Sequence, residues 1–248
     1  MKKFHDFFKE EMKDTGILLR SVPSLTVSIF FLSVVCANLL ANKELFNFKY
    51  LAMDCGFAFS WIMFLCMDII CKRWGPKASI KISVISLVMN LFVCAVFFLL
   101  SKTPGKWGEF YTTENIAVNN ALNATFGGSW YVVLGSATAS LVSSVVNSLL
   151  NFYIGKIVRK DGFLAFAARS YFSTLAGQFV DNLVFATIVS KFFFGWTWTQ
   201  VFLCSGIAAF LELLAEILFS GIGYKVLKKW EEDDVGREYL DYLKARKK

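Results

Sequence analysis

The chain has 248 residues, of which 56% are hydrophobic and 17% aromatic, and its formal net charge is +7. A soluble domain of this length does not carry so much apolar surface, so the composition predicts an integral membrane protein. The positive charge would suggest nucleic-acid binding in a soluble chain. Here, however, the Lys and Arg residues flank apolar runs, and we expect no nucleic-acid partner.

Several apolar runs approach or exceed the roughly 20 residues that cross the hydrocarbon core of a bilayer. Their expected bounds are 23–42, 55–71, 78–100, 130–154, 163–194 and 198–226. We therefore predict an all-α integral membrane protein with six transmembrane helices in one domain, residues 22–226. Residues 1–21 place Phe4, Phe8, Met12 and Leu19 near one face of a charged helix, and residues 227–248 form a charged tail. A short helix on the membrane surface is expected at each end.

Lys and Arg counts in the connections predict the orientation. The N-terminal segment has five, the 72–81 turn four, the 156–160 turn three and the tail from residue 225 eight, whereas the alternate connections have two, two and one. Because cytoplasmic loops carry the basic excess, both termini are predicted to be cytoplasmic. The long connection 101–129 is then extracellular, either as an ordinary loop or as a lid over an entrance.

The fifth span carries the most informative pattern, RSYFSTLAGQFVDN over residues 169–182. At about 100° per residue, Phe172 and Leu175 fall on one side of a helix and the polar side chains on the other. An ionisable side chain in a span costs about 2.5–3.5 kcal/mol on insertion scales, so Asp181 needs a compensating role. A stripe that only joins helices is the alternative. We favour a binding surface formed by Ser170, Ser173, Thr174, Gln178 and Asp181.

Polar residues in other spans extend this candidate site. Asn38 lies near the end of the first span, Asp68 near the cytoplasmic end of the second and Asn147 near the middle of the fourth. Glu212 and Glu216 lie one turn apart on the sixth span and repel each other if both are ionised, so one is expected to be protonated. Such a pair suits proton coupling, although a structural ion pair explains a buried carboxylate equally well.

Enzyme motifs are not legible in the sequence. It has no nucleotide-binding loop, zincin helix or hydrolase elbow. The six Cys residues have no metal-site spacing, and the single His, His5, lies outside every span. We expect no metal, no cofactor and no enzymatic activity. Acidic and amide side chains on several helices are what a polar organic solute requires.

Taken in order, the spans resemble the vitamin uptake transporter family, whose characterised members are queuosine precursor transporters. The matching residues are Asn38 to Lys43 ending the first span, Asp68 with Gly75 around the second, Arg169, Ser173, Thr174, Gln178 and Asp181 in the fifth, and Tyr224 ending the sixth. The resemblance covers residues 25–226. It implies a multi-pass transporter of the bacterial inner membrane that imports 7-cyano- or 7-aminomethyl-7-deazaguanine.

The implied solute gives the polar residues a chemical role. A carboxylate such as Asp181 accepts hydrogen bonds from both the N1–H and the 2-amino group of a guanine-type edge. Gln178, Asn147 or Asn38 would serve the acceptors of the base, and Phe185 would stack on its ring. Asp68, Arg169, Ser173 and Thr174 complete the implied substrate site.

Two charged positions depart together from the family's pattern. Lys72 stands where the family usually has a glutamate, four residues after Asp68, and Glu212 stands where it usually has a lysine, twelve residues before Tyr224. The joint exchange predicts a structural ion pair between Lys72 and Glu212.

Three functions are consistent with the sequence, and we prefer a secondary transporter or facilitator. A substrate-binding subunit of a multi-protein importer would use Ala37 and Ala41 as a small-residue docking face. A membrane enzyme with an intramembrane polar site is the third. The sequence defines neither the coupling ion nor the oligomeric state, and a homo-oligomer is left open.

Overall fold

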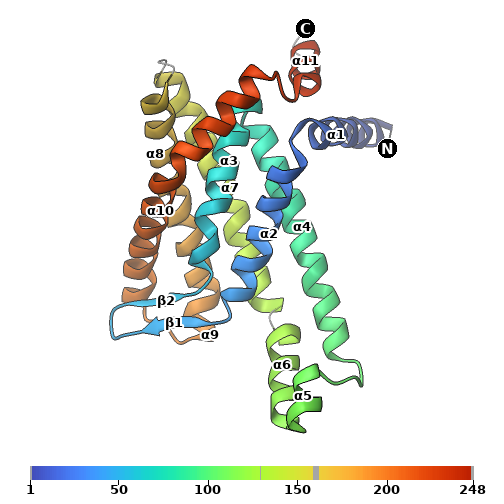
Figure 1. Ribbon diagram of the computed structural model, residues 1–248, viewed down its shortest axis with the longest axis vertical. Helices are drawn as coiled ribbons and strands as arrows, with labels where there is room; N and C mark the ends of the chain where they lie inside the picture. Colours follow the sequence, from blue (N-terminus) through green and yellow to red (C-terminus); the bar gives the residue numbers. More distant parts are fainter. Residues whose placement is uncertain (1, 129, 159–161, 247–248) are drawn as a thin grey trace.

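The computed structural model describes residues 2–128, 130–158 and 162–246. Within these ranges, long helices run alongside one another as a bundle (Figure 1). They are α2 (Ser24–Leu40), α3 (Phe57–Trp74), α4 (Pro76–Ser101), α7 (Trp130–Ile157), α8 (Phe163–Phe185) and α10 (Trp198–Glu232). The predicted all-α fold class is confirmed.

Four helical stretches of the described chain are long and apolar enough to cross a membrane, namely residues 76–101, 116–157, 163–193 and 198–232. Residues 9–21 of α1 (Lys2–Ser21) pass the same test together with α2, bent by 104° at their junction, which gives up to five spans. α3 is not among these stretches because its 18 residues include three charged ones, Asp68, Lys72 and Arg73. The multi-pass membrane class is therefore confirmed, whereas the count of six and the orientation stay predictions.

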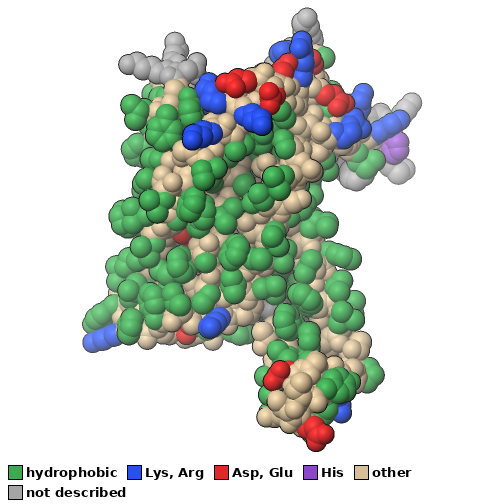
Figure 2. All heavy atoms as spheres, in the orientation of Figure 1, with side chains coloured by type: hydrophobic (Ala, Val, Ile, Leu, Met, Phe, Trp, Pro, Cys, Tyr) green, Lys and Arg blue, Asp and Glu red, His purple; other side chains and the backbone are tan. Residues whose placement is uncertain are grey.

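Charged side chains gather at the two ends of the molecule, and hydrophobic side chains cover much of the flank between them (Figure 2). Both termini lie at the same end, where α1 and α11 (Arg237–Ala245) lie (Figure 1). On α1, Met12 and Leu19 of the expected apolar face are exposed. The side chains of Phe4 and Phe8, together with Arg159 and Lys160 of the basic count, lie outside the described part of the structure.

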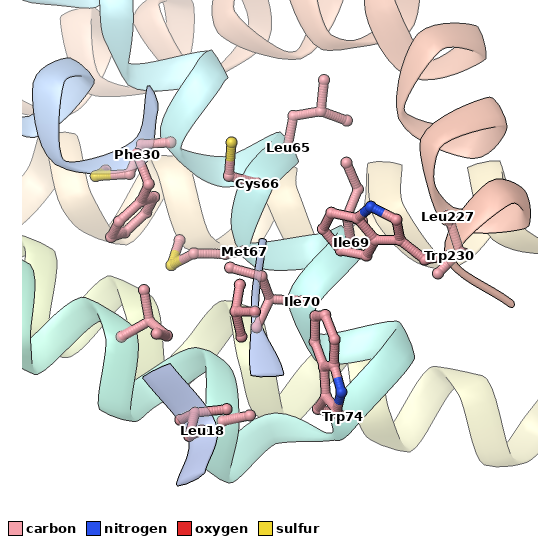
Figure 3. Packing of buried hydrophobic residues seen from close by; sticks show 14 of the residues in the cluster. Leu18, Phe30, Leu65, Cys66, Met67, Ile69, Ile70, Trp74, Leu227 and Trp230 are labelled. Carbon is pink, nitrogen blue, oxygen red and sulfur yellow. The ribbon is translucent and has the colours of Figure 1, made fainter. Parts of the chain in front are cut away.

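An apolar core fills the end of the bundle near the termini (Figure 3). Ile70 of α3 and Leu18 of α1 have no exposed surface, and the ring centroids of Trp74 and Trp230 lie 5.2 Å apart. Full burial of one such aliphatic side chain contributes about 1.5–3 kcal/mol. This core fixes the ends of α3 and α10 against each other.

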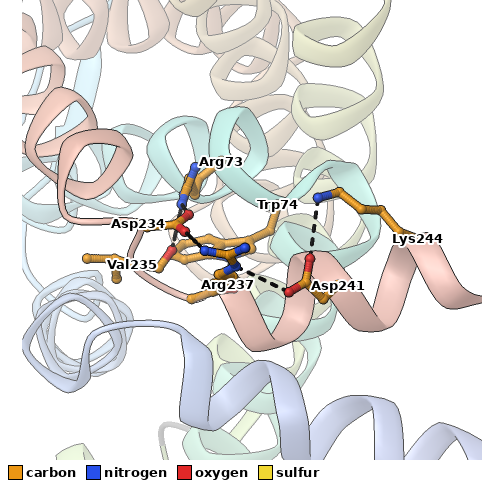
Figure 4. Close-up of polar contacts among 8 residues, drawn as sticks. Arg73, Trp74, Asp234, Val235, Arg237, Asp241 and Lys244 are labelled. Atoms are coloured by element: carbon orange, nitrogen blue, oxygen red, sulfur yellow. Dashed lines mark hydrogen bonds and ion pairs between the residues drawn. The ribbon is translucent and has the colours of Figure 1, made fainter.

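Polar contacts tie the chain between α10 and α11 to α3 (Figure 4). Arg73 donates from Nε and Nη2 to the carbonyl oxygen of Val235, at 3.1 and 2.9 Å. Gly236 has φ +69°, and a Cβ there would lie 2.6 Å from the Trp74 ring, so glycine is required on both counts. The pairs among Asp234, Arg237, Asp241 and Lys244 are exposed and contribute about 1 kcal/mol each at most.

Short elements that the sequence analysis did not predict lie at the opposite end. In the connection between α2 and α3, β1 (Glu44–Asn47) pairs antiparallel with β2 (Ala52–Asp54). Trp196 Nε1 donates to Glu44 Oε1 at 3.0 Å, and Gln200 Nε2 donates to the carbonyl oxygen of Phe48 at 3.2 Å. These bonds hold the hairpin against the start of α10 and so position Asp54, the last residue of β2.

The connection 101–129 is not a plain loop. It contains α5 (Gly108–Thr113) and α6 (Ile116–Gly128), which project beyond the rest of the bundle (Figures 1 and 2). Over 163–194, where one helix was predicted, α8 passes through a π-helical turn, η1 (Ala186–Ser190), into α9 (Lys191–Phe193). A widened turn of this kind is frequent at functional sites.

The polar face of α8 is directed into the bundle, as its sequence pattern predicts. Its fully buried polar side chains are Ser170, Ser173, Thr174 and Gln178. Phe172, on the opposite face, is 68% exposed. A Cβ at Gly177 would lie 2.8 Å from the Cβ of Asn147 and 2.9 Å from the Phe64 ring. The backbone of α8 therefore approaches α7 and α3 closely because this position has no side chain.

Candidate functional site

A cavity lies between the helices in the half of the bundle near the hairpin. It has an empty volume of about 360 Å³ and is partly open to the exterior. We call it the carboxylate cavity and define it by Ala37, Asn38 and Ala41 of α2, Asp54 and Gly56 before α3, Phe57 and Ser60 of α3, Ser136 of α7, Asp181, Asn182 and Phe185 of α8, and Glu212 of α10. Its lining combines apolar and aromatic side chains with a few converging polar groups, which is the composition of a small-molecule pocket.

A second hollow of about 350 Å³ adjoins the first. The two share Asp54, Phe57, Asn182 and Phe185, and the second continues toward Trp196 and Ser205. Two phenylalanine rings and an indole thus lie beside the acidic and amide groups. A flat, polar molecule finds both kinds of partner here.

Three carboxylates line the carboxylate cavity, and no Lys or Arg is among its lining residues. Asp54 Oδ1 accepts from the Gly56 N–H at 2.7 Å, and Asp181 Oδ1 accepts from Ser143 Oγ at 2.7 Å. Glu212 accepts from Ser60 Oγ through Oε1 and from Asn182 Nδ2, at 3.1 Å, through Oε2. The cavity is therefore rich in acceptors and suits a solute that brings N–H donors or a positive charge.

Burial raises the pKa of the Asp54 carboxyl from 3.8 to about 7. The hydrogen bond from the Gly56 N–H lowers that pKa, and the nearby carboxylates of Asp181 and Glu44 raise it. Asp54 therefore changes its charge near neutral pH.

Local backbone features explain how the carboxylates come together. A Cβ at Gly56 would lie 2.7 Å from the carbonyl oxygen of Ala37 and 3.3 Å from the Cβ of Ala41, so only glycine lets this turn approach α2. Asp181 and Asn182 are adjacent on α8, and both line the cavity. Ala37 and Ala41, the docking face of the importer-subunit alternative, also line this cavity, and that alternative stays a prediction.

A second group of polar side chains is buried between α3, α7, α8 and α10, nearer the termini. We call it the inner cluster and define it by Asp68, Asn147, Ser170, Thr174 and Glu216. All five side chains are fully buried. Asp68 accepts from Asn147 Nδ2 at 2.9 Å, from Thr174 Oγ1 at 3.1 Å and from Ser170 Oγ. Ser170 Oγ also lies 2.6 Å from Glu216 Oε1.

The structure divides the predicted substrate-site residues between these two places. Asn38, Asp181 and Phe185 line the carboxylate cavity, as does Glu212. Asp68, Asn147 and Thr174 belong to the inner cluster and line neither cavity. Their expected contact with a solute stays a prediction.

Three further predicted residues lie beside the inner cluster. Ser173 accepts from Asn151 Nδ2 at 3.3 Å. Arg169 is buried against Gly155, where a Cβ would lie 2.8 Å from its guanidinium. Gln178, one turn before Asp181, is fully buried, and neither of its side-chain polar atoms has a partner among the described residues. A buried amide in that state has unused hydrogen-bonding capacity.

The predicted ion pair between Lys72 and Glu212 does not fit the structure. Glu212 accepts from Ser60, which lies twelve residues before Lys72 on the same helix. At 1.5 Å per residue, that separation is about 18 Å, beyond the reach of a lysine side chain. Glu212 and Glu216 each have polar partners on other helices, and their predicted repulsion stays a prediction.

Sequence reasoning missed Asp54, Ser60 and Asn182 as lining residues. Asp54 was assigned to a connection, and its neighbour Gly56 was the available sign that the chain turns tightly there. Ser60 and Asn182 carry no charge, so nothing in their spacing separated them from packing residues. Within the described residues, no group of three or more His, Cys, Asp or Glu side chains could hold a metal ion.

A helical membrane bundle with a polar cavity between its helices is the architecture of a small-solute transporter. The chain belongs to the putative vitamin uptake transporter family, whose model matches residues 54–229. The matched range begins at Asp54 and includes every other carboxylate of the cavity and of the inner cluster. Comparisons with curated proteins and with solved structures found no match.

Proposed function

We propose that this chain is a secondary transporter that imports a queuosine precursor, a purine-like solute of the 7-deazaguanine type, across the bacterial inner membrane. The observation that carries the proposal is the carboxylate cavity, which brings acceptors, amides and aromatic rings together between the helices. Family membership supports the transporter class.

The chemistry of a guanine-type base matches the lining residues. Its N1–H and 2-amino group form a row of donors that one carboxylate can accept in parallel, and Asp181 faces the cavity with one oxygen beyond its bond to Ser143. Asn38 and Asn182 supply amide groups for the acceptors of the base, and the rings of Phe57 and Phe185 supply stacking surfaces. An aminomethyl substituent would place a positive charge among the carboxylates.

The proposed direction of transport rests on the basic-residue counts. Both termini lie at one end of the bundle, and the hairpin beside the cavity lies at the other (Figure 1). With cytoplasmic termini, the cavity would open toward the exterior. A single Cys at position 106 should react with an impermeant thiol reagent from outside the cell, whereas one at position 77 should react only after permeabilisation. The reverse pattern would invert the proposed orientation.

Uptake by proteoliposomes that contain only this chain tests the function. Labelled 7-aminomethyl-7-deazaguanine should accumulate inside, and unlabelled guanine-type bases should compete. An analogue without the 2-amino group should compete poorly, because the carboxylate would lose a donor it was built to accept. Binding without uptake would favour the importer-subunit alternative, and a chemically changed product would favour an enzyme. Failure to bind any of these bases would refute the proposed solute.

A further inference from the structure

The hydrogen bonds of the inner cluster require one of its two carboxyl groups to be protonated. Ser170 Oγ lies within hydrogen-bond distance of Asp68 Oδ2 and, at 2.6 Å, of Glu216 Oε1. A hydroxyl has one hydrogen and donates to one acceptor at a time. The second contact is therefore a hydrogen bond only if one carboxyl itself carries a proton and donates it to Ser170 Oγ.

We infer that Asp68 and Glu216 form a proton-binding site, bridged by the Ser170 hydroxyl, that serves as the coupling site for uptake. In the resting arrangement Glu216 Oε1–H donates to Ser170 Oγ, and Ser170 O–H donates to Asp68 Oδ2. If the Glu216 proton moves to Ser170 Oγ while the Ser170 proton moves to Asp68, one proton has passed between the carboxyls. Ser170 is then again a neutral hydroxyl, and no other reactant is needed.

The partners of each carboxyl decide where the proton rests. Asp68 accepts from three side chains, Asn147, Ser170 and Thr174, which stabilise its ionised form. Glu216 Oε2 is buried and has no partner among the described residues. An ionised carboxylate with a bare oxygen in an apolar interior is far more costly than a neutral acid in the same place. The proton therefore rests on Glu216.

A further acceptor in the cluster has unused capacity. Asn147 donates to Asp68 through Nδ2, whereas its Oδ1 is buried without a partner among the described residues. Asn147 has no exposed surface. The Asn147 amide therefore keeps an unused acceptor beside the Asp68 carboxylate to which it donates.

The charged and titratable groups nearest this pair on the packed elements include Asp68, Lys72 and Cys71 on α3, Arg169, Tyr171 and Asp181 on α8, and Glu212 on α10. Glu216 lies one helical turn from Glu212, which lines the carboxylate cavity. Proton release from Glu216 would bring a negative charge to within one turn of that cavity. This link between proton and solute rests on the proposed function, whereas the proton site itself does not.

Infrared spectroscopy tests the proton site without any transport measurement. At neutral pH the wild-type protein should show the C=O stretch of a buried protonated carboxyl, part of which is lost in Glu216→Gln. The matched control is Glu231→Gln, on the same helix, because Glu231 is ion-paired with Lys228 and part-exposed. That control should leave the band unchanged. Retention of the full band in folded Glu216→Gln would overturn the inference.

Ser170→Ala keeps the test informative if Glu216→Gln does not fold. This change removes the hydroxyl oxygen that accepts the hydrogen bond from the Glu216 carboxyl, so the frequency of the same C=O band should shift. An unchanged spectrum in the folded Ser170→Ala variant, whose other carboxyls are intact, would also overturn the inference.

Proteoliposome uptake tests the coupling. With one proton moved per solute, a gradient of one pH unit, acidic outside, should concentrate the solute up to about tenfold. Glu216→Gln mimics the protonated state and should still bind and exchange solute, but with an accumulation ratio near one. Accumulation driven by a sodium gradient instead would overturn the assignment to protons. If no base binds while the infrared result holds, the proposed solute fails and the proton site stands.

Discussion

Replacing Asp181 by Asn tests whether the cavity carboxylate binds the solute. Asp181 Oδ1 accepts from Ser143 Oγ at 2.7 Å, and the residue is only partly buried because it lines the carboxylate cavity. The asparagine oxygen can keep the bond to Ser143, which leaves its amide N–H₂ facing the cavity. A donor would then stand where the solute's own N–H groups need an acceptor.

The expected loss follows from this single exchange. A hydrogen bond to a charged group contributes about 1.5–3 kcal/mol, which corresponds to about a 10- to 150-fold rise in Kd. Because Ser143 keeps its acceptor, the amount of folded protein should be close to wild type.

Equilibrium binding of a guanine-type base to purified protein measures this effect. Asp233→Asn is the matched control, since it makes the same chemical change at an exposed position beyond the end of α10. Unchanged affinity in well-folded Asp181→Asn would remove Asp181 from the solute site. Loss of folded protein would show instead that its main role is structural.

Three further predictions concern charge and packing. Lys72→Glu and Glu212→Lys should each lower the yield of folded protein. Because about 18 Å separates the two sites, the double variant should show the sum of both losses. Rescue of the yield in the double variant would show that the two residues do pair. Wild-type thermal stability should fall as pH rises from about 4 to 7, because the folded chain holds on Asp54 a proton that the unfolded chain releases, and Asp54→Asn should flatten that slope. Gly177→Ala should lower stability by about 1–3 kcal/mol through overpacking; Gly221→Ala, where a Cβ meets nothing within 4 Å, is its control, and equal melting temperatures would refute the close approach.

Helix positions were largely predictable because apolar length is a strong signal. The span expected over 78–100 is α4, Pro76–Ser101, and the one expected over 130–154 is α7, Trp130–Ile157. The hairpin was not predictable, because β1 and β2 have four and three residues and owe their pairing to tertiary contacts with Trp196 and Gln200. The π-helical turn after Phe185 has no sequence rule that would reveal it.

The sequence predicted which helix faces form the candidate site, but not which of their residues border the cavity. Helical periodicity directed Thr174, Gln178 and Asp181 inward, and the structure has them there. Periodicity does not say which buried polar residues border a cavity and which bond to one another. Asp68 and Asp181 were both candidates for the solute site, yet one is enclosed by three donors and the other lines the cavity. That distinction depends on the neighbouring helices.

A structure of the purified chain with 7-aminomethyl-7-deazaguanine bound tests the central claim most directly. The account predicts the base in the carboxylate cavity, with its N1–H and 2-amino group directed at Asp181 or Glu212 and its ring against Phe57 or Phe185. A base bound outside that cavity, or no bound base at saturating concentration, would contradict the account.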